Sequence, residues 1–187
     1  LNPFLFYRPT EYSIGSQDRI MLGANFSYNF GPVMLFGQFM IDDFVLSELR
    51  SRSRWWSNKY AGQFGFKGKG RLSRNVTMIY SSEINFARPF TFSHLNQGTN
   101  WGHQGIPLGH PLGANFVESF SFVELNIKRK LRLRAELMVA QQGGQDSNEE
   151  FMFGEDIYRS YTERPYEYGY FIGGNGQLNR TRLTLEA

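Results

Sequence analysis

The sequence contains no cysteine. This excludes a fold held together by disulfides, and it excludes metal sites and nucleophiles that depend on cysteine. Long apolar runs are also missing, since no stretch approaches the roughly 18 consecutive apolar residues of a membrane-spanning helix. The mean hydropathy is only −0.43. Such a low value remains compatible with a transmembrane β-barrel, because a barrel exposes only alternate residues to lipid.

Motifs for catalysis and for nucleic-acid binding are absent too. The formal net charge is +3, and the lysines and arginines are spread along the chain, which argues against a nucleic-acid partner. No nucleophile motif such as Gly-x-Ser-x-Gly occurs. The glycine-rich segments 67–70 and 173–176 lack the strand–loop–helix context of a phosphate loop. We therefore expect a protein that is not an enzyme and that needs no cofactor.

A period-two alternation of apolar and small or polar residues dominates the sequence. It is clearest where Leu22, Ala24 and Phe26 alternate with Gly23 and Asn25. Period two is typical of β-strands with two different faces. The pattern predicts seven strands, at 19–30, 33–42, 61–69, 76–87, 117–128, 131–141 and 178–187. Most are near the roughly 9–11 residues that a tilted strand needs to cross a bilayer, whereas ordinary strands centre on about five or six.

The predicted connections are short on one side and long on the other. Short turns fall at 31–32, 70–75 and 129–130, and long loops at 43–60, 88–116 and 142–177. This is the layout of outer-membrane barrels, which have short periplasmic turns and long extracellular loops. We predict a single all-β domain over 1–187, an antiparallel transmembrane β-barrel. Both ends look cut, so we expect a partial barrel or an internal fragment. A soluble antiparallel sheet with one wet face is the alternative.

Charged residues occupy the polar positions of the last predicted strands. If these positions face a barrel lumen, opposite charges on neighbouring strands can pair across the sheet. The predicted lumen charge ladder consists of Glu124, Arg132, Arg134, Glu136, Arg180, Arg182 and Glu186.

Several segments together resemble one family. They are Leu1-Asn2-Pro3-Phe4, Tyr7 to Tyr12, Gly37 to Phe44 (GQFMIDDF), Arg88 to His94 and His110 to Glu118 (HPLGANFVE). The chain from Leu1 to about Gly143 is similar to the Wzi-like capsule-assembly barrels of the outer membrane, most of all to the branch of the gliding motility protein RemB.

The resemblance implies a location in the outer membrane of a Gram-negative bacterium and a role in surface assembly without catalysis. Expected partners are outer-membrane lipid, surface polysaccharide, and proteins of a motility or secretion complex. A channel or transporter for a small solute is the alternative function. A barrel enzyme such as a lipase or protease is a third, weakened by the missing catalytic arrangement.

Aromatic residues are frequent in the predicted long loops. Aromatic faces beside polar groups suit sugar stacking or protein contact, and an aromatic girdle at the membrane interface is the alternative. The candidate ligand or partner contacts are Trp55, Trp56, Trp101, Tyr161, Tyr166 and Tyr168.

Titratable residues in the loops give no clear metal or catalytic site. His94, His103 and His110 lack zinc-ligand spacing, and we expect His94 and His110 to fix loop structure by hydrogen bonds. Asp42 and Asp43 end a strand, where we expect them to bond loop backbone or an arginine. The candidate arginines are Arg50, Arg52 and Arg54. The acidic run of Asp146, Glu149, Glu150, Glu155 and Asp156 does not have EF-hand spacing, and we expect a solvated loop there.

Overall fold

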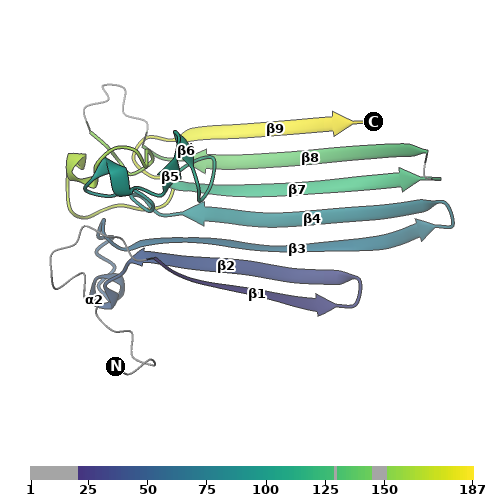
Figure 1. Ribbon diagram of the computed structural model, residues 1–187, viewed down its shortest axis with the longest axis horizontal. Helices are drawn as coiled ribbons and strands as arrows, with labels where there is room; N and C mark the ends of the chain where they lie inside the picture. The colour runs from purple at the N-terminus through teal and green to yellow at the C-terminus, as the bar shows by residue number, and fades with distance from the viewer. Residues whose placement is uncertain (1–20, 129, 145–150) are drawn as a thin grey trace.

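The protein is all-β and is built on one seven-stranded antiparallel sheet. A computed structural model describes residues 21–128, 130–144 and 151–187. The strand order is β1-β2-β3-β4-β7-β8-β9, and the sheet is not closed within these residues, so β1 and β9 are its edges (Figure 1). The strands are β1 (Leu22–Phe30), β2 (Val33–Asp43), β3 (Lys59–Ser73), β4 (Val76–Ala87), β7 (Phe116–Ile127), β8 (Leu131–Gln142) and β9 (Leu178–Glu186).

The small elements of the chain lie in its long connections. They are α2 (Leu46–Arg50), β5 (Gly102–His103), β6 (Ile106–Pro107), and 3-10 turns at Gln97–Thr99 and Tyr161–Glu163. Figure 1 shows these connections gathered at one end of the sheet, with the short turns at the other end. In the described part of the chain, no helix is long and apolar enough to cross a membrane.

All seven predicted strands are present, and the main error concerns the turn predicted at 70–75. β3 continues to Ser73, so only Arg74 and Asn75 form the turn. Arg71 still pairs with Thr77, and after a register shift Ser73 pairs with Val76. Backbone pairing between β3 and β4 thus continues beyond Gly70, the residue at which the sequence predicts the turn to begin. The start of the first predicted strand, at 19–20, lies outside the described residues.

The register places the apolar positions of every strand on the same side of the sheet, which we call the apolar face. One row across it runs from Phe66 through Ser82, Ser121 and Leu137 to Leu183. Solvent reaches most of this face, whose exposed large side chains include Leu22, Phe26, Tyr28, Phe30, Leu35, Phe39, Phe64, Phe66, Ile84, Val117, Val123, Leu131, Leu133, Leu137, Val139, Leu183 and Leu185. The described chain thus leaves a broad hydrophobic surface without a protein layer over it.

Glycines on the apolar face make room for aromatic rings from neighbouring strands. A Cβ on Gly37 would lie 2.5 Å from the Phe26 ring and 2.8 Å from the Phe64 ring. Gly62 lies in the same way under Phe86. Because real Cβ atoms do not approach so closely, glycine allows these rings to lie across the backbone.

The opposite side, the polar face, carries amides, hydroxyls and charged groups, with an apolar core only near the long loops. That core consists of Ala87 and Phe116 from the strands, with Phe92, Ala114 and Ile157 from the connections. The two faces therefore differ as the period-two pattern requires.

Candidate functional site

Ion pairs cross the polar face between β7 and β8. Glu124 accepts from Arg132 at 2.7 Å (Nη2) and 2.9 Å (Nε), and Arg134 approaches the same oxygen at 3.5 Å. Arg134 also pairs with Glu136 on its own strand at 2.6 Å. These four members of the predicted charge ladder therefore come together.

The ladder members on β9 lie on the same face but do not extend the network. Glu186 is opposite Arg134 in register, Arg182 is opposite Met138, and Arg180 is opposite Ala140. Among the described residues, none of these three β9 side chains forms an ion pair. Arg180 and Arg182 form no ion pair because the residues opposite them on β8 are apolar, so no acidic group faces them.

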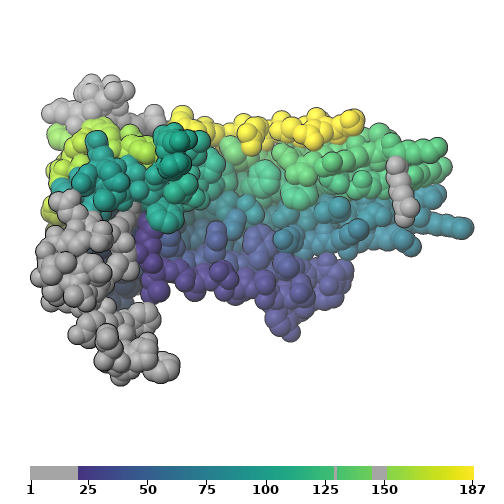
Figure 2. Space-filling model, in the orientation of Figure 1, coloured from purple at the N-terminus to yellow at the C-terminus, as the bar shows by residue number. Residues whose placement is uncertain are grey.

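The long connections fold together into what we call the loop cap, residues 44–58, 88–115, 143–144 and 151–177. It forms a lobe beyond the strands (Figure 2). Its interior is a second hydrophobic cluster, distinct from the core on the polar face, and contains Trp56, Phe90, Met152 and Tyr170. Since these residues come from all three connections, the three loops fold as one unit.

The six aromatic residues expected to contact ligands or partners differ in how exposed their side chains are. Trp101, Tyr166 and Tyr168 are exposed, whereas Trp55 and Tyr161 are half-buried. Trp56 is only 9% exposed, so it is a core residue, and neither ligand stacking nor a membrane girdle describes it. The structure brings three of the six together, because the Trp56 ring centroid lies 6.1 Å from that of Trp55 and 4.8 Å from that of Tyr161.

Polar and cationic groups surround Trp56. Its Nε1 donates to Glu167 at 2.7 Å, and the Arg164 guanidinium lies 4.0 Å over its ring. The ammonium of Lys59 lies 5.2 Å from the Trp56 ring and 4.5 Å from that of Tyr161. Such cation–π contacts are stronger when the cation is desolvated, and Lys59 is only 1% exposed.

The carboxylate that balances Lys59 is Asp43, at 2.9 Å. Asp43 lies at the end of β2, as expected, but its partner is this lysine and not Arg50, Arg52 or Arg54. The sequence contains no clue to a buried lysine at this position. Asp42 also has an interaction partner.

Two further buried polar residues connect the loops, and the sequence did not identify either of them. Arg88 donates to the carbonyl oxygens of Trp55 (3.2 Å) and Tyr170 (3.3 Å). Asn115 donates to the carbonyls of Phe153 (3.0 Å) and Gly174 (3.3 Å), and its Oδ1 accepts from the Gly173 N–H at 2.9 Å. Each residue thus satisfies backbone groups of loops far away in sequence.

A cavity of about 440 Å³ separates the 88–115 loop from the polar face of the sheet. Amide side chains of the strands and aromatic side chains of the loop contribute to its wall. These include Asn25, Gln38, Gln63, Asn85, Phe92 and Trp101. Amides beside the exposed ring of Trp101 suit a neutral, hydroxyl-rich ligand.

His110 closes one side of this cavity and is held in a defined orientation. Its ring stacks on Phe116 with centroids 4.3 Å apart. Nδ1 accepts from the Leu112 N–H at 3.2 Å, so the proton of the neutral ring is on Nε2, which donates to Glu118 at 3.2 Å. Burial lowers the pKa of His110, and the nearby Glu118 carboxylate opposes that shift. Asn85 also donates to Glu118, at 3.0 Å.

The remaining titratable loop residues have structural contacts. His94 Nδ1 lies 2.6 Å from the Thr99 hydroxyl and accepts from the Asn96 N–H at 3.3 Å, so it shapes its loop as expected. Within the residues described, no group of three or more His, Asp or Glu side chains is arranged to hold a metal ion. Of the acidic run, Asp146, Glu149 and Glu150 lie outside the described residues.

Glu155 differs from the solvated carboxylate that the sequence suggested. It is partly buried in the loop cap, and its Oε2 accepts from the Phe153 N–H at 3.1 Å. Burial raises the pKa of this carboxyl group to about 7, and the neighbouring Asp156 adds to the shift.

Comparison with known proteins gives no relative: no family model, no curated protein and no solved structure matches the chain. The resemblance to Wzi-like barrels therefore stays a prediction from the sequence.

Proposed function

We propose that the chain forms part of the wall of a Gram-negative outer-membrane β-barrel and acts in surface assembly without catalysis. The observation that carries this proposal is the apolar face. Seven neighbouring strands expose apolar side chains on one side, and a soluble monomer rarely exposes so large an apolar patch. This exposed apolar face supports lipid as its partner.

The lengths of the strands also support a lipid bilayer around the apolar face. A strand of 12 residues, such as β8, is about 40 Å long, or about 30 Å across a bilayer at a tilt near 40°. That height matches a typical hydrocarbon core.

Polar groups on the apolar face have partners within the protein. Ser82 and Ser121 lie opposite each other, with their hydroxyl oxygens 2.8 Å apart. A hydroxyl that donates to its neighbour is less costly to place in lipid than one without a partner.

The loop cap is the part proposed to lie outside the cell. Its exposed aromatics and the amide-lined cavity beneath it support contact with surface polysaccharide or with proteins of a motility or secretion complex. Transport of a small solute is the second candidate, favoured by the charged polar face. Planar-bilayer conductance separates the two functions, since steady conductance with a solute-dependent block supports transport.

Cysteine labelling tests the topology, because the chain has no cysteine of its own. Tyr168→Cys places a thiol in the exposed cap, and Arg74→Cys places one in the turn at the other end of the sheet. In intact cells a membrane-impermeant maleimide should label the first variant and not the second, while both label after lysis. Recovery of the protein in the soluble fraction without detergent, or equal labelling of both variants in intact cells, would overturn the proposal.

A further inference from the structure

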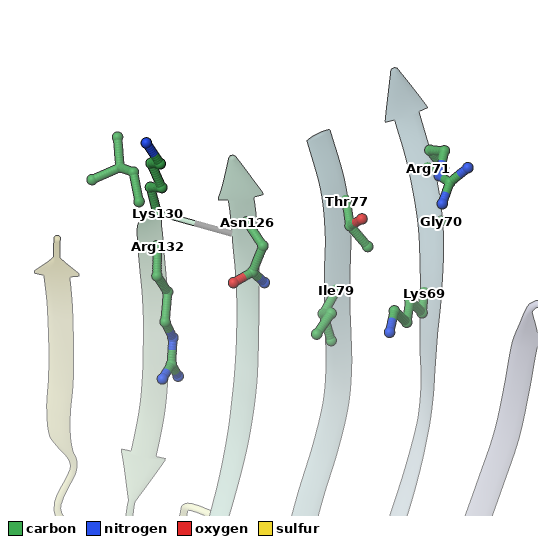
Figure 3. A pocket seen from close by; sticks show the side chains of 9 residues that line it. Lys69, Gly70, Arg71, Thr77, Ile79, Asn126, Lys130 and Arg132 are labelled. Atoms are coloured by element: carbon green, nitrogen blue, oxygen red, sulfur yellow. The ribbon is translucent and has the colours of Figure 1, made fainter. Parts of the chain in front are cut away.

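A groove of about 640 Å³ lies on the polar face at the short-turn end of the sheet, far from the loop cap. Figure 3 shows the side chains that line it, which come from β3, β4, β7, β8 and, for Lys130, the turn before β8. Four of them are cationic, Lys69, Arg71, Lys130 and Arg132, and none of the nine lining residues is acidic.

The strand register sets the row nearest the turns. Arg71 pairs with Thr77, Thr77 with Asn126, and Asn126 with Arg132. A hydroxyl and an amide thus separate two guanidinium-bearing positions across four adjacent strands. At about 4.8 Å per strand, the backbones of Arg71 and Arg132 are about 14 Å apart.

The floor of the groove is fixed by the ion-pair network beside it. Glu124 holds Arg132 through two nitrogens and accepts from the Asn126 amide at 2.8 Å. Asn126 and Arg132 are therefore oriented before any ligand arrives, which lowers the entropic cost of binding.

The positive charge of the groove is only partly balanced. Arg132 and Arg134 are balanced by Glu124 and Glu136. Lys69, Arg71 and Lys130 form no ion pair among the described residues, which leaves three positive charges at one place. Arg180 and Arg182 also form no ion pair among the described residues, but both lie on β9, outside the groove.

We propose that the groove binds a soluble ligand that carries several phosphate groups. The cations are carried on strands whose outer backbones are about 14 Å apart, and linked phosphates offer acceptor oxygens along such a length. Lysine and arginine are the usual donors to phosphate oxygens. Most of the groove's lining lies on the polar face, turned away from a bilayer that surrounds the apolar face, and Leu131 at its edge is the only lining side chain that belongs to the apolar face. The choice of a soluble source rests on the proposed function, whereas the preference for phosphate rests on the cationic lining alone.

Titration calorimetry of purified protein with sodium tripolyphosphate tests the inference. Arg71→Gln and Lys130→Gln remove exposed cations and should each weaken binding about tenfold, the equivalent of about 1.4 kcal/mol. Arg182→Gln is the matched control, since it removes an equal charge from an exposed arginine of the same face, outside the groove. Arg71→Lys should retain most of the affinity.

The outcomes separate specific binding from general attraction. Binding of the wild type that falls in the groove variants and not in Arg182→Gln supports the inference. Absence of binding, or equal losses in all variants, overturns it. Polyglutamate that binds as tightly as tripolyphosphate overturns the phosphate preference. The source of the phosphate groups is tested in nanodiscs in which phosphatidylglycerol replaces neutral lipid. If tripolyphosphate no longer binds there, lipid headgroups occupy the groove, and the proposal of a soluble ligand is wrong.

Discussion

Leu137→Arg is the sharpest test of what covers the apolar face. Leu137 is 45% exposed at the middle of β8, between Ser121 and Leu183 in register. At the centre of a bilayer, an arginine on the lipid-facing side of a barrel strand costs about 2–4 kcal/mol. At a water-exposed strand position, a substitution usually changes stability by no more than about 0.5 kcal/mol. The two environments therefore predict different results for one variant.

Thr184→Arg is the matched control. Thr184 lies on the polar face of β9, opposite Glu136, so the added arginine is solvated and faces a carboxylate. Urea unfolding in lipid vesicles, followed by the fluorescence of the three tryptophans, gives the free energy of unfolding for both variants. We expect Leu137→Arg to be less stable than Thr184→Arg by at least about 2 kcal/mol. A difference within about 0.5 kcal/mol would refute a lipid environment for this face.

Two further predictions concern the loop cap. Asn115→Ala should destabilise the cap by about 2–4 kcal/mol, because buried backbone groups of Phe153, Gly173 and Gly174 lose a partner; hydrogen exchange at Gly173 measures this. Burial holds the pKa of Glu155 near 7 against an ordinary value of 4.5, so the stability it contributes is complete below about pH 4.5 and is lost as the pH rises through about 7. The rise in pH should therefore cost the wild-type cap about 3 kcal/mol of stability, and Glu155→Gln should abolish this pH dependence. Protease resistance of the cap, compared between pH 5 and pH 8 in both proteins, measures the difference.

Each cap prediction has a result that contradicts it. Asn96→Ala removes an exposed side chain whose Oδ1 accepts from the Gly98 N–H of its own loop, and it is the control for Asn115. Equal hydrogen exchange at Gly173 in both variants would show that Asn115 does not join the loops. For Glu155, an unchanged pH dependence in the glutamine variant would assign the effect to another group.

The strands were predictable because their determinants are local. A side-chain period of two is imposed by the backbone, so Val76–Ala87 could be read from the sequence with its exact ends. The ion pairs of Glu124 with Arg132 and Arg134 followed from the same alternation, once β7 and β8 were joined by a tight turn. Pairing across one short turn leaves little freedom of register.

The loop cap was not predictable because its determinants are distant in sequence. Lys59, Arg88 and Asn115 are polar residues, which composition alone assigns to the surface. Arg88 and Asn115 are buried because their partners come from other loops, such as Tyr170 for Arg88, at a separation of 82 residues, and Lys59 lies against the ring of Tyr161 from a distant loop. Trp56 was misplaced for the same reason, since its partner Glu167 lies 111 residues away. No periodic pattern encodes such pairings.

The glycines beneath aromatic rings on the apolar face restrict how this surface can change. A methyl group at Gly37 would displace the rings of Phe26 and Phe64 on the two flanking strands. The side chains at these three positions therefore depend on one another. A larger residue at position 37 fits best with a smaller side chain at position 26 or 64. Gly62 and Phe86 depend on one another in the same way. A larger side chain at either glycine therefore requires the overlying ring to move or to be replaced by a smaller side chain.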